Sequence, residues 1–189
     1  MSKIFVAGSI SIRQLDPRVK ARIDSIVAGD HTVIVGDANG ADSSVQAYLS
    51  CKDAAQAIVY CSGPKPRNNI GGWAVVCVDA RHAAPGTRAF FTAKDVEMAK
   101  AADFGLMIWD ARSTGTLRNV MELLLRGKVA VVFINTTKSF LTVRGVEQLD
   151  RLLSFMAAPA LRKAEEKPDL RTRFGQLRNG QAAMFADAG

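Results

Sequence analysis

Three short segments of the chain combine glycine with hydroxyl, amide or carboxylate side chains, which are residue types that bind phosphates and sugars. Each segment follows an apolar run typical of a buried strand, and two of them open a helical pattern. Helix N-termini present unpaired N–H groups and the positive end of the helix dipole, so they bind anions. We therefore predict that the segments bind a phosphate-bearing ligand. The predicted ligand-binding residues are Gly8 and Ser9; Asp37, Asn39, Gly40 and Asp42; and Arg112, Ser113, Thr114, Gly115 and Thr116.

Each segment also has a plain structural explanation. The first fits an ordinary turn out of a strand, Asp42 fits a first-turn helix carboxylate, and Ser113 or Thr114 fits a helix N-cap. Residues 36–42 match neither the GxGxxG fingerprint nor a Walker loop, because no Gly-Lys-Ser/Thr follows them. Their common position favours binding, since ligands of open parallel sheets bind beyond the carboxyl ends of the strands. We predict that the three segments meet at one edge of a sheet.

The sheet is predicted from short β-rich runs that alternate with longer helical patterns over the first 157 residues, as in βαβ units. Several of these runs are apolar without interruption, as expected for strands buried on both faces. The predicted fold is an α/β, Rossmann-like three-layer sandwich with a mainly parallel sheet, built as one domain over residues 1–157. Strands are predicted at residues 4–7, 32–35, 57–60, 75–78, 105–109 and 129–134. Helices are predicted at residues 17–28, 40–51, 92–101, 114–126 and 144–156.

Two stretches depart from this alternation. Residues 61–91 hold several prolines and glycines around one short strand, and long irregular loops in compact domains are often functional. Arg67, Asn68 and Trp73 in this stretch supply a planar cation, an amide and an indole that suit a nucleotide base. Residues 158–189 have few branched apolar side chains and mixed charge. We predict that they form a basic, flexible or partner-docked C-terminal tail, which the core does not need for folding.

Composition bounds the class of protein. The chain has 189 residues, 48% of them hydrophobic, which is enough for one well-formed core. No apolar run is long enough to cross a membrane, and the three cysteines lack a metal-ligand spacing and fit core thiols in a reducing compartment. We predict a cytoplasmic protein without a metal site or cofactor, and leave a homodimer open. The net charge of +7 suits anionic small ligands as well as nucleic acid.

The motifs together resemble those of the SLOG superfamily. The resemblance rests on Gly8-Ser9, Gly40-Ala41-Asp42, the segment Lys94-Asp95-Val96-Glu97-Met98 and Gly115-Thr116, within residues 3–135. Proteins of this group are similar in fold to DNA processing protein A (DprA), the lonely-guy phosphoribohydrolases and nucleotide-sensor domains. Residues 103–131 also resemble the nucleoside 2-deoxyribosyltransferases. The resemblance implies a Rossmann-like fold, a nucleotide-derived ligand and a place for Lys94 in the binding site.

The sequence departs from the pattern of the lonely-guy enzymes at three places, one of which is Arg112-Ser113-Thr114 where those enzymes have Pro-Gly-Gly before Gly-Thr. Lys94 stands where those enzymes have an arginine four residues before a methionine, and Asn119 where they have a glutamate three residues after Gly-Thr. An amide cannot act as the carboxylate that stabilises developing charge when an N-glycosidic bond breaks. Glu122, one helical turn further on, and Asp110 remain as catalytic candidates. We therefore predict a nucleotide-binding sensor or nucleotide-handling module, with Asn119 as a binding residue. Two alternatives stay open: an N-glycosidase or deoxyribosyltransferase-like enzyme, and a DprA-like binder of single-stranded DNA.

Overall fold

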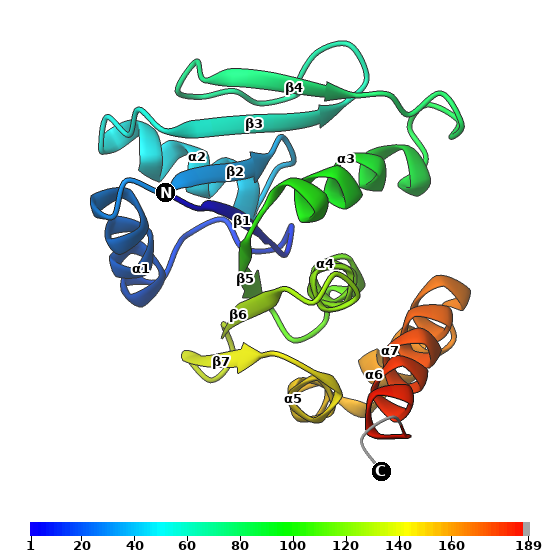
Figure 1. Cartoon of the computed structure of the whole chain (residues 1–189). Helices are drawn as coiled ribbons and strands as arrows, with labels where there is room; N and C mark the ends of the chain where they lie inside the picture. Colours follow the sequence, from blue (N-terminus) through cyan, green and yellow to red (C-terminus); the bar gives the residue numbers. More distant parts are fainter. Residues whose placement is uncertain (187–189) are drawn as a thin grey trace.

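The computed structural model describes residues 1–186, with side chains through Gly180, and places seven strands in one sheet (Figure 1). Residues 187–189, the end of the predicted tail, lie outside the described residues. In sheet order the strands are β4 (Ala74–Val78), β3 (Ala57–Ser62), β2 (Thr32–Gly36), β1 (Lys3–Gly8), β5 (Phe104–Trp109), β6 (Val129–Ile134) and β7 (Ser139–Val143). Neighbouring strands are parallel except β7, which pairs antiparallel with β6. The predicted α/β, Rossmann-like fold with a mainly parallel sheet is confirmed.

Helices cover both faces of the sheet (Figure 1). One face carries α1 (Pro17–Ala28) and α2 (Ala41–Cys51); the other carries α3 (Arg88–Ala101), α4 (Thr114–Leu124), α5 (Val146–Leu153), α6 (Ala158–Glu165) and α7 (Pro168–Ala186). Ile4 and Val6 of β1 belong to the core on the α1–α2 side, whereas Phe5 and Ala7 belong to the other core. Because both faces are buried, successive strand positions are apolar, which explains the unbroken apolar runs in the sequence.

Within residues 1–157 the observed elements lie close to the predicted ones, apart from β7 and the start of α3. β7 was not predicted, because Ser139 and Thr142 leave it only two consecutive apolar residues, fewer than in any other strand. α3 begins at Arg88 rather than at residue 92, since the Thr87 side chain accepts a hydrogen bond from the Phe90 amide and caps the helix earlier. Asp16 is the N-cap of α1, and its side chain accepts a hydrogen bond from the Arg18 amide.

The C-terminal segment, predicted to be a flexible tail outside the domain, forms α6 and α7 on the same side of the sheet as α4 and α5 (Figure 1). Ala164 of α6 and Leu170 of α7 are fully buried. Asp169 and Arg173, near the start of α7, form ion pairs with side chains of α4. The described part of this segment therefore packs on the core instead of extending from it. Whether residues 1–157 fold without it stays a prediction.

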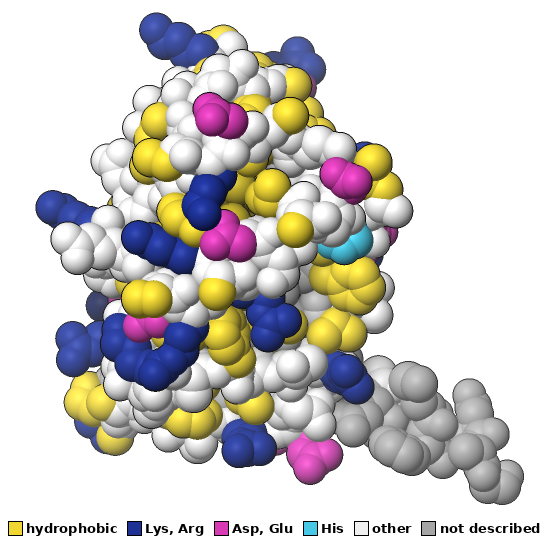
Figure 2. Space-filling model, turned by 90° about the vertical axis from the view of Figure 1, so that its left-hand side faces the viewer, with side chains coloured by type: hydrophobic (Ala, Val, Ile, Leu, Met, Phe, Trp, Pro, Cys, Tyr) yellow, Lys and Arg dark blue, Asp and Glu magenta, His cyan; other side chains and the backbone are white. Residues whose placement is uncertain are grey.

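Charged and apolar side chains are mixed over the surface. Figure 2 shows Lys and Arg side chains spread over one face of the molecule among hydrophobic and uncharged ones.

The cysteines differ in exposure. β4 at the sheet edge is largely exposed, and so is its Cys77, whereas Cys61 on β3 is buried. The two sulfur atoms lie 3.6 Å apart. Cys51 is also exposed, so only Cys61 fits the prediction of a core thiol. None of the described helices combines the length and the apolar character that crossing a bilayer requires.

Candidate nucleotide-binding site

The three predicted segments lie together at the carboxyl edge of the sheet, between β1 and β5. The chain leaves β1 toward β2 on one side and leaves β5 toward β6 on the other, which makes this the switch point of the sheet. Ser9 Oγ lies 3.3 Å from Thr116 Oγ1 and accepts a hydrogen bond of 3.1 Å from the Asp110 amide. The Ala41 amide donates to the Ser9 carbonyl at 3.3 Å, so the second segment joins the same edge.

The glycines at this edge serve close packing. A Cβ on Gly8 would clash with the Ile108 carbonyl of β5. Gly40 has a φ of +82°, and a Cβ there would clash with the Ile10 carbonyl. The Ser9 amide, predicted to be free for a phosphate, donates to the Ile108 carbonyl at 2.9 Å. Gly8 and Gly40 therefore hold the end of β1 against β5 and the start of α2.

The first turn of α4 is the place where backbone amides remain free. Ser113 is the N-cap: its hydroxyl accepts from the Thr116 amide at 3.3 Å and its carbonyl from the Leu117 amide at 3.2 Å. Within the described part of the chain, the Thr114 and Gly115 amides between them donate no hydrogen bond. A Cβ on Gly115 would fit without a clash, in ordinary contact with Ser113 Oγ at 3.7 Å and Arg88 Nη2 at 3.9 Å. An anion is therefore best placed beside Thr114 and Gly115.

Asp110 stabilises the loop between β5 and α4. Its Oδ1 accepts from the Arg112 and Ser113 amides at 2.9 and 2.7 Å, and its Oδ2 accepts from the Ser11 hydroxyl at 2.7 Å. Burial alone would raise the pKa of Asp110, but these hydrogen bonds outweigh burial and hold the pKa below its ordinary value. Asp110 is therefore an ionised acceptor whose two oxygens are already engaged. The Arg112 side chain beside it is exposed.

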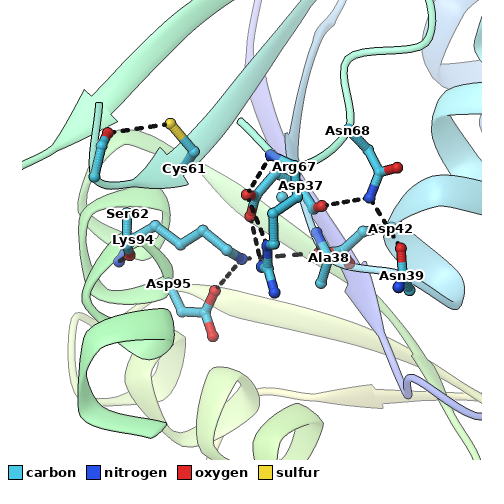
Figure 3. Close-up of polar contacts among 12 residues, drawn as sticks. Asp37, Ala38, Asn39, Asp42, Cys61, Ser62, Arg67, Asn68, Lys94 and Asp95 are labelled. Atoms are coloured by element: carbon cyan, nitrogen blue, oxygen red, sulfur yellow. Dashed lines mark hydrogen bonds and ion pairs between the residues drawn. The ribbon is translucent and has the colours of Figure 1, made fainter. Parts of the chain in front are cut away.

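Asp37 and Asn39, predicted to contact the ligand, are held by the loop between β3 and β4 (Figure 3). The amide and Nε of Arg67 donate to Asp37 Oδ2 at 3.0 Å each, and its Nη2 donates to Oδ1 at 2.8 Å. Asn68 Nδ2 donates to the Asp37 carbonyl at 2.7 Å and to Asn39 Oδ1 at 3.1 Å. Burial would raise the pKa of Asp37, but the Arg67 hydrogen bonds and the Lys94 charge hold it below its ordinary value. Asp37 therefore has a protein counter-ion.

The indole of the same loop faces the core. Trp73 Nε1 donates to the Ala54 carbonyl at 2.7 Å, and the ring packs on the α1–α2 side of the sheet. Asn69 closes the turn before it, donating to the Trp73 carbonyl at 2.8 Å and accepting from its amide at 3.0 Å. The prediction that this indole stacks on a base is wrong. Arg67 instead lies over the Phe91 ring, 4.4 Å from its centre.

Lys94 lies buried behind the second segment. Its Nζ is 2.8 Å from Asp95 Oδ1 and 3.8 Å from Asp42 Oδ2, and its side chain is 5% exposed (Figure 3). Gly36 makes room for this cluster, because a Cβ there would clash with the Asp42 carboxylate. Burial alone would lower the pKa of Lys94, but the charges of Asp95 and Asp42 hold it above its ordinary value. Lys94 is therefore a buried counter-ion that joins α3 to α2.

Asp42 makes stability depend on pH. Burial raises the pKa of Asp42 to about 6, against the opposing charge of Lys94 and with the like charges of Asp95 and Asp37. Between about pH 4 and 6 the native state therefore binds a proton that the unfolded chain does not, so the stability contributed by this group falls as pH rises through that window. We expect the difference in free energy of unfolding between Asp42→Asn and wild type to shift in favour of Asp42→Asn between roughly pH 4 and pH 6. Above that window the difference should stay constant. Urea unfolding of both proteins over this pH series measures the difference. Free energies of unfolding that change with pH in the same way in both proteins would contradict the prediction.

The catalytic candidate Glu122 and the binding candidate Asn119 lie on the part of α4 turned toward α3 and α7. Both are buried and line a cavity of about 360 Å³ between these helices. The Glu122 carboxylate forms ion pairs with Arg126 through one oxygen and with Arg173 through the other. Both oxygens of this carboxylate are therefore engaged in ion pairs within the protein. In the described part of the chain, no group of three His, Cys, Asp or Glu side chains is placed to hold a metal ion.

Comparison with known proteins adds one structural likeness. No protein-family model matches the chain, and no curated protein matches it. A solved structure of DNA processing protein A from Helicobacter pylori, described for its single-stranded DNA binding mode, is similar at 18% identity with a TM-score of 0.48. The likeness covers 69% of this chain and 64% of that chain, less than two thirds of its length. It concerns the fold alone; no likeness to a nucleoside 2-deoxyribosyltransferase accompanies it.

The sequence did not point to the cations around the start of α4. Arg88 Nη2 and Lys167 Nζ both donate to Thr114 Oγ1, at 2.9 and 2.7 Å. Arg88 also lines the cavity, so it links the cavity to the edge of the sheet. The spacing of Arg118 and Glu122, four residues apart on one face of α4, was a signal for the cavity itself. No sequence pattern indicated Arg88 and Lys167, because they lie 26 and 53 residues away from Thr114 along the chain.

Proposed function

We propose that the chain binds a nucleotide or a nucleotide-derived ligand at the carboxyl edge of the sheet, with its phosphate at the start of α4. The observation that carries this proposal is the pair of free amides at Thr114 and Gly115, in the first turn of a helix at the switch point. The hydroxyls of Ser9 and Thr116, 3.3 Å apart, are buried beneath this turn and hold the loop after β5 against the end of β1. The resemblance of the motifs to the SLOG superfamily supports the same ligand class.

Binding without bond cleavage agrees best with the carboxylates of the site. Asn119 supplies an amide at the position where the lonely-guy enzymes have a glutamate. The Glu122 carboxylate is paired with two arginines, and the Asp110 carboxylate accepts three hydrogen bonds from its own loops. Neither carboxylate has the free oxygen that attack on a sugar carbon or stabilisation of an oxocarbenium ion needs. We therefore place a sensor or nucleotide-handling module ahead of an N-glycosidase.

Calorimetric titration with the nucleoside 5′-monophosphates of the common bases tests the binding proposal. Gly115→Asp adds a negative charge where the phosphate is proposed, and a carboxylate in the first turn of a helix is compatible with the helix dipole. We expect this variant to bind nucleotide at least about tenfold more weakly than wild type, because a charge-assisted contact is replaced by repulsion.

Gly175→Asp is the matched control, since it makes the same charge change at an exposed position of α7 where a side chain meets nothing within 4 Å. This variant should bind nucleotide as wild type does. Failure of wild type to bind any nucleotide, or equal binding by Gly115→Asp, would overturn the proposal. Binding of a single-stranded oligonucleotide in place of the mononucleotides would support the DNA-binding alternative instead.

A base-release assay separates binding from cleavage. Wild type, Glu122→Gln and Asp110→Asn are incubated with the nucleoside monophosphates and with NAD, and free base is measured. We expect no release by any of the three proteins. Release by wild type that falls about 100- to 1000-fold in either variant, the usual cost of removing a group that stabilises developing charge, would establish the N-glycosidase alternative.

A further inference from the structure

The cavity between α3, α4 and α7 is lined by charged side chains from all three helices. Arg88 comes from α3, Arg118 and Glu122 come from α4, and Asp169 and Arg173 come from α7. Its volume is about 360 Å³. The cavity is therefore closed in part by the C-terminal helices, and its charges are brought together only when α7 lies against α4.

The positive charges around this cavity are not fully balanced. Glu122 pairs with Arg173, Asp169 pairs with Arg118, and Asp95, which also lines the cavity, pairs with Lys94. Arg88 and Lys167 form no ion pair in the described part of the chain; each donates to the neutral hydroxyl of Thr114. Two cations thus converge on one oxygen atom at the N-terminus of α4, where the helix dipole is also positive.

One side-chain nitrogen of Arg118 lacks a hydrogen-bond partner among the described residues. Its side chain is 10% exposed, and its Nε and Nη2 both reach Asp169 Oδ2. Its Nη1 is buried and has no hydrogen-bond partner among the described residues. Buried polar groups in folded proteins nearly always have a partner, and an unpaired donor on a charged group is costly. An acceptor from outside the chain would satisfy it.

We propose that a phosphate group binds beside Thr114, contacted by Arg88, Arg118 and Lys167, so that the start of α7 is part of the site. The inference rests on the proposed function in so far as a nucleotide supplies the phosphate; free inorganic phosphate is the other source of the same group. Arginine and lysine are the side chains that bind phosphate oxygens through charge-assisted hydrogen bonds. The free amides at the start of α4 lie next to the same oxygen of Thr114.

The titration behaviour of the cations agrees with this geometry. Burial lowers the pKa of Arg88, and the nearby charge of Arg118 lowers it further. Burial, Arg88 and Arg118 likewise lower the pKa of Lys167. The charge of Asp169 opposes these effects without cancelling them, so a bound anion would relieve the remaining repulsion among the cations.

Calorimetry and thermal unfolding with inorganic phosphate test the site, and the same titrations with nucleoside 5′-monophosphates and with nucleosides identify the source of the phosphate. The variants are Arg88→Gln and Lys167→Gln, each of which removes one cation without touching the Arg118–Asp169 pair. We expect inorganic phosphate to bind wild type and to raise its melting temperature. Each variant should weaken that binding by about tenfold or more, because each loses one charge-assisted hydrogen bond. Arg88→Lys, which keeps the charge, should recover part of the loss.

Arg171→Gln is the control, since it removes one exposed cation from α7 outside the cavity and should bind phosphate as wild type does. Absence of phosphate binding by wild type, or equal binding by all variants, would overturn the inference. Nucleotide binding that is lost in Gly115→Asp but unchanged in Arg88→Gln and Lys167→Gln would also overturn it while leaving the proposed function intact. Phosphate binding that depends on Arg88 and Lys167, without nucleotide binding, would support the inference and refute the proposed function.

Discussion

Replacing Lys94 with methionine is expected to lower the free energy of unfolding by about 3 to 5 kcal/mol, because one partner of a buried ion pair is removed. Methionine is similar in length but uncharged, so Asp42 and Asp95 lose their shared counter-ion. The Asp42 side chain is 7% exposed, and water cannot replace Lys94 as its partner. Chemical denaturation at neutral pH, followed by circular dichroism, measures the loss.

Lys100→Met on the same helix is the control for this prediction. Lys100 pairs with Glu97 at 2.6 Å, but both side chains are about half exposed, so its loss should cost no more than about 1 kcal/mol. The double variant Lys94→Met/Asp42→Asn should be more stable than Lys94→Met, since the unpaired carboxylate is gone. A Lys94→Met protein as stable as Lys100→Met would show that the buried pair contributes little.

The central part of the fold was predictable from the sequence because of one physical property. Strands buried on both faces are apolar at every position, so β1, β2, β3, β5 and β6 stand out as short runs between helical patterns. β7 has only two consecutive apolar residues, Phe140 and Leu141, so its sequence carries no comparable pattern. The first turn of α3 was missed for another reason: Thr87 was not considered as a cap, although its hydroxyl accepts from the Phe90 amide.

The position of the candidate site was predictable, but most of its contacts were not. That Ser9 and Thr116 lie close together follows from the rule that loops after parallel strands share one edge. That Asp37 is bound by Arg67, or that Lys94 is buried with its carboxylates, depends on how a loop and a helix fold over that edge. No local pattern reports these contacts, because Arg67 lies 30 residues from Asp37 and Lys94 lies far along the chain from Asp42.

Composition also led to the expectation of a dispensable tail. The segment has few branched apolar residues, but Leu170, Phe174 and Leu177 follow the spacing of one helical face and pack on the core. The mean composition of a segment hides such a stripe, whereas its periodicity shows it. From the contacts of α7 we expect truncation to destabilise the protein, whereas the composition of the segment predicts little effect.

Deletion of residues 158–189 is expected to lower the free energy of unfolding by about 3 to 5 kcal/mol. The fully buried Leu170 alone contributes about 1.5 to 3 kcal/mol through apolar burial. The deletion also removes Asp169 and Arg173, the ion-pair partners that α7 supplies to Arg118 and Glu122 of α4. A loss of this size should lower the melting temperature by more than about 6 °C in a protein of this length.

Two further variants show whether the loss comes from docking of α7. Deletion of residues 181–189 only removes none of the contacts named above, so it should melt close to wild type. Leu170→Ala in the full chain should reproduce about 2 to 5 kcal/mol of the loss, since it removes a fully buried leucine side chain. If the protein truncated before residue 158 melts within a few degrees of wild type, α6 and α7 are bound too weakly to hold Lys167 in a phosphate site. The phosphate site would then have to be completed by the ligand itself, and inorganic phosphate should stabilise the full chain but not the truncated one.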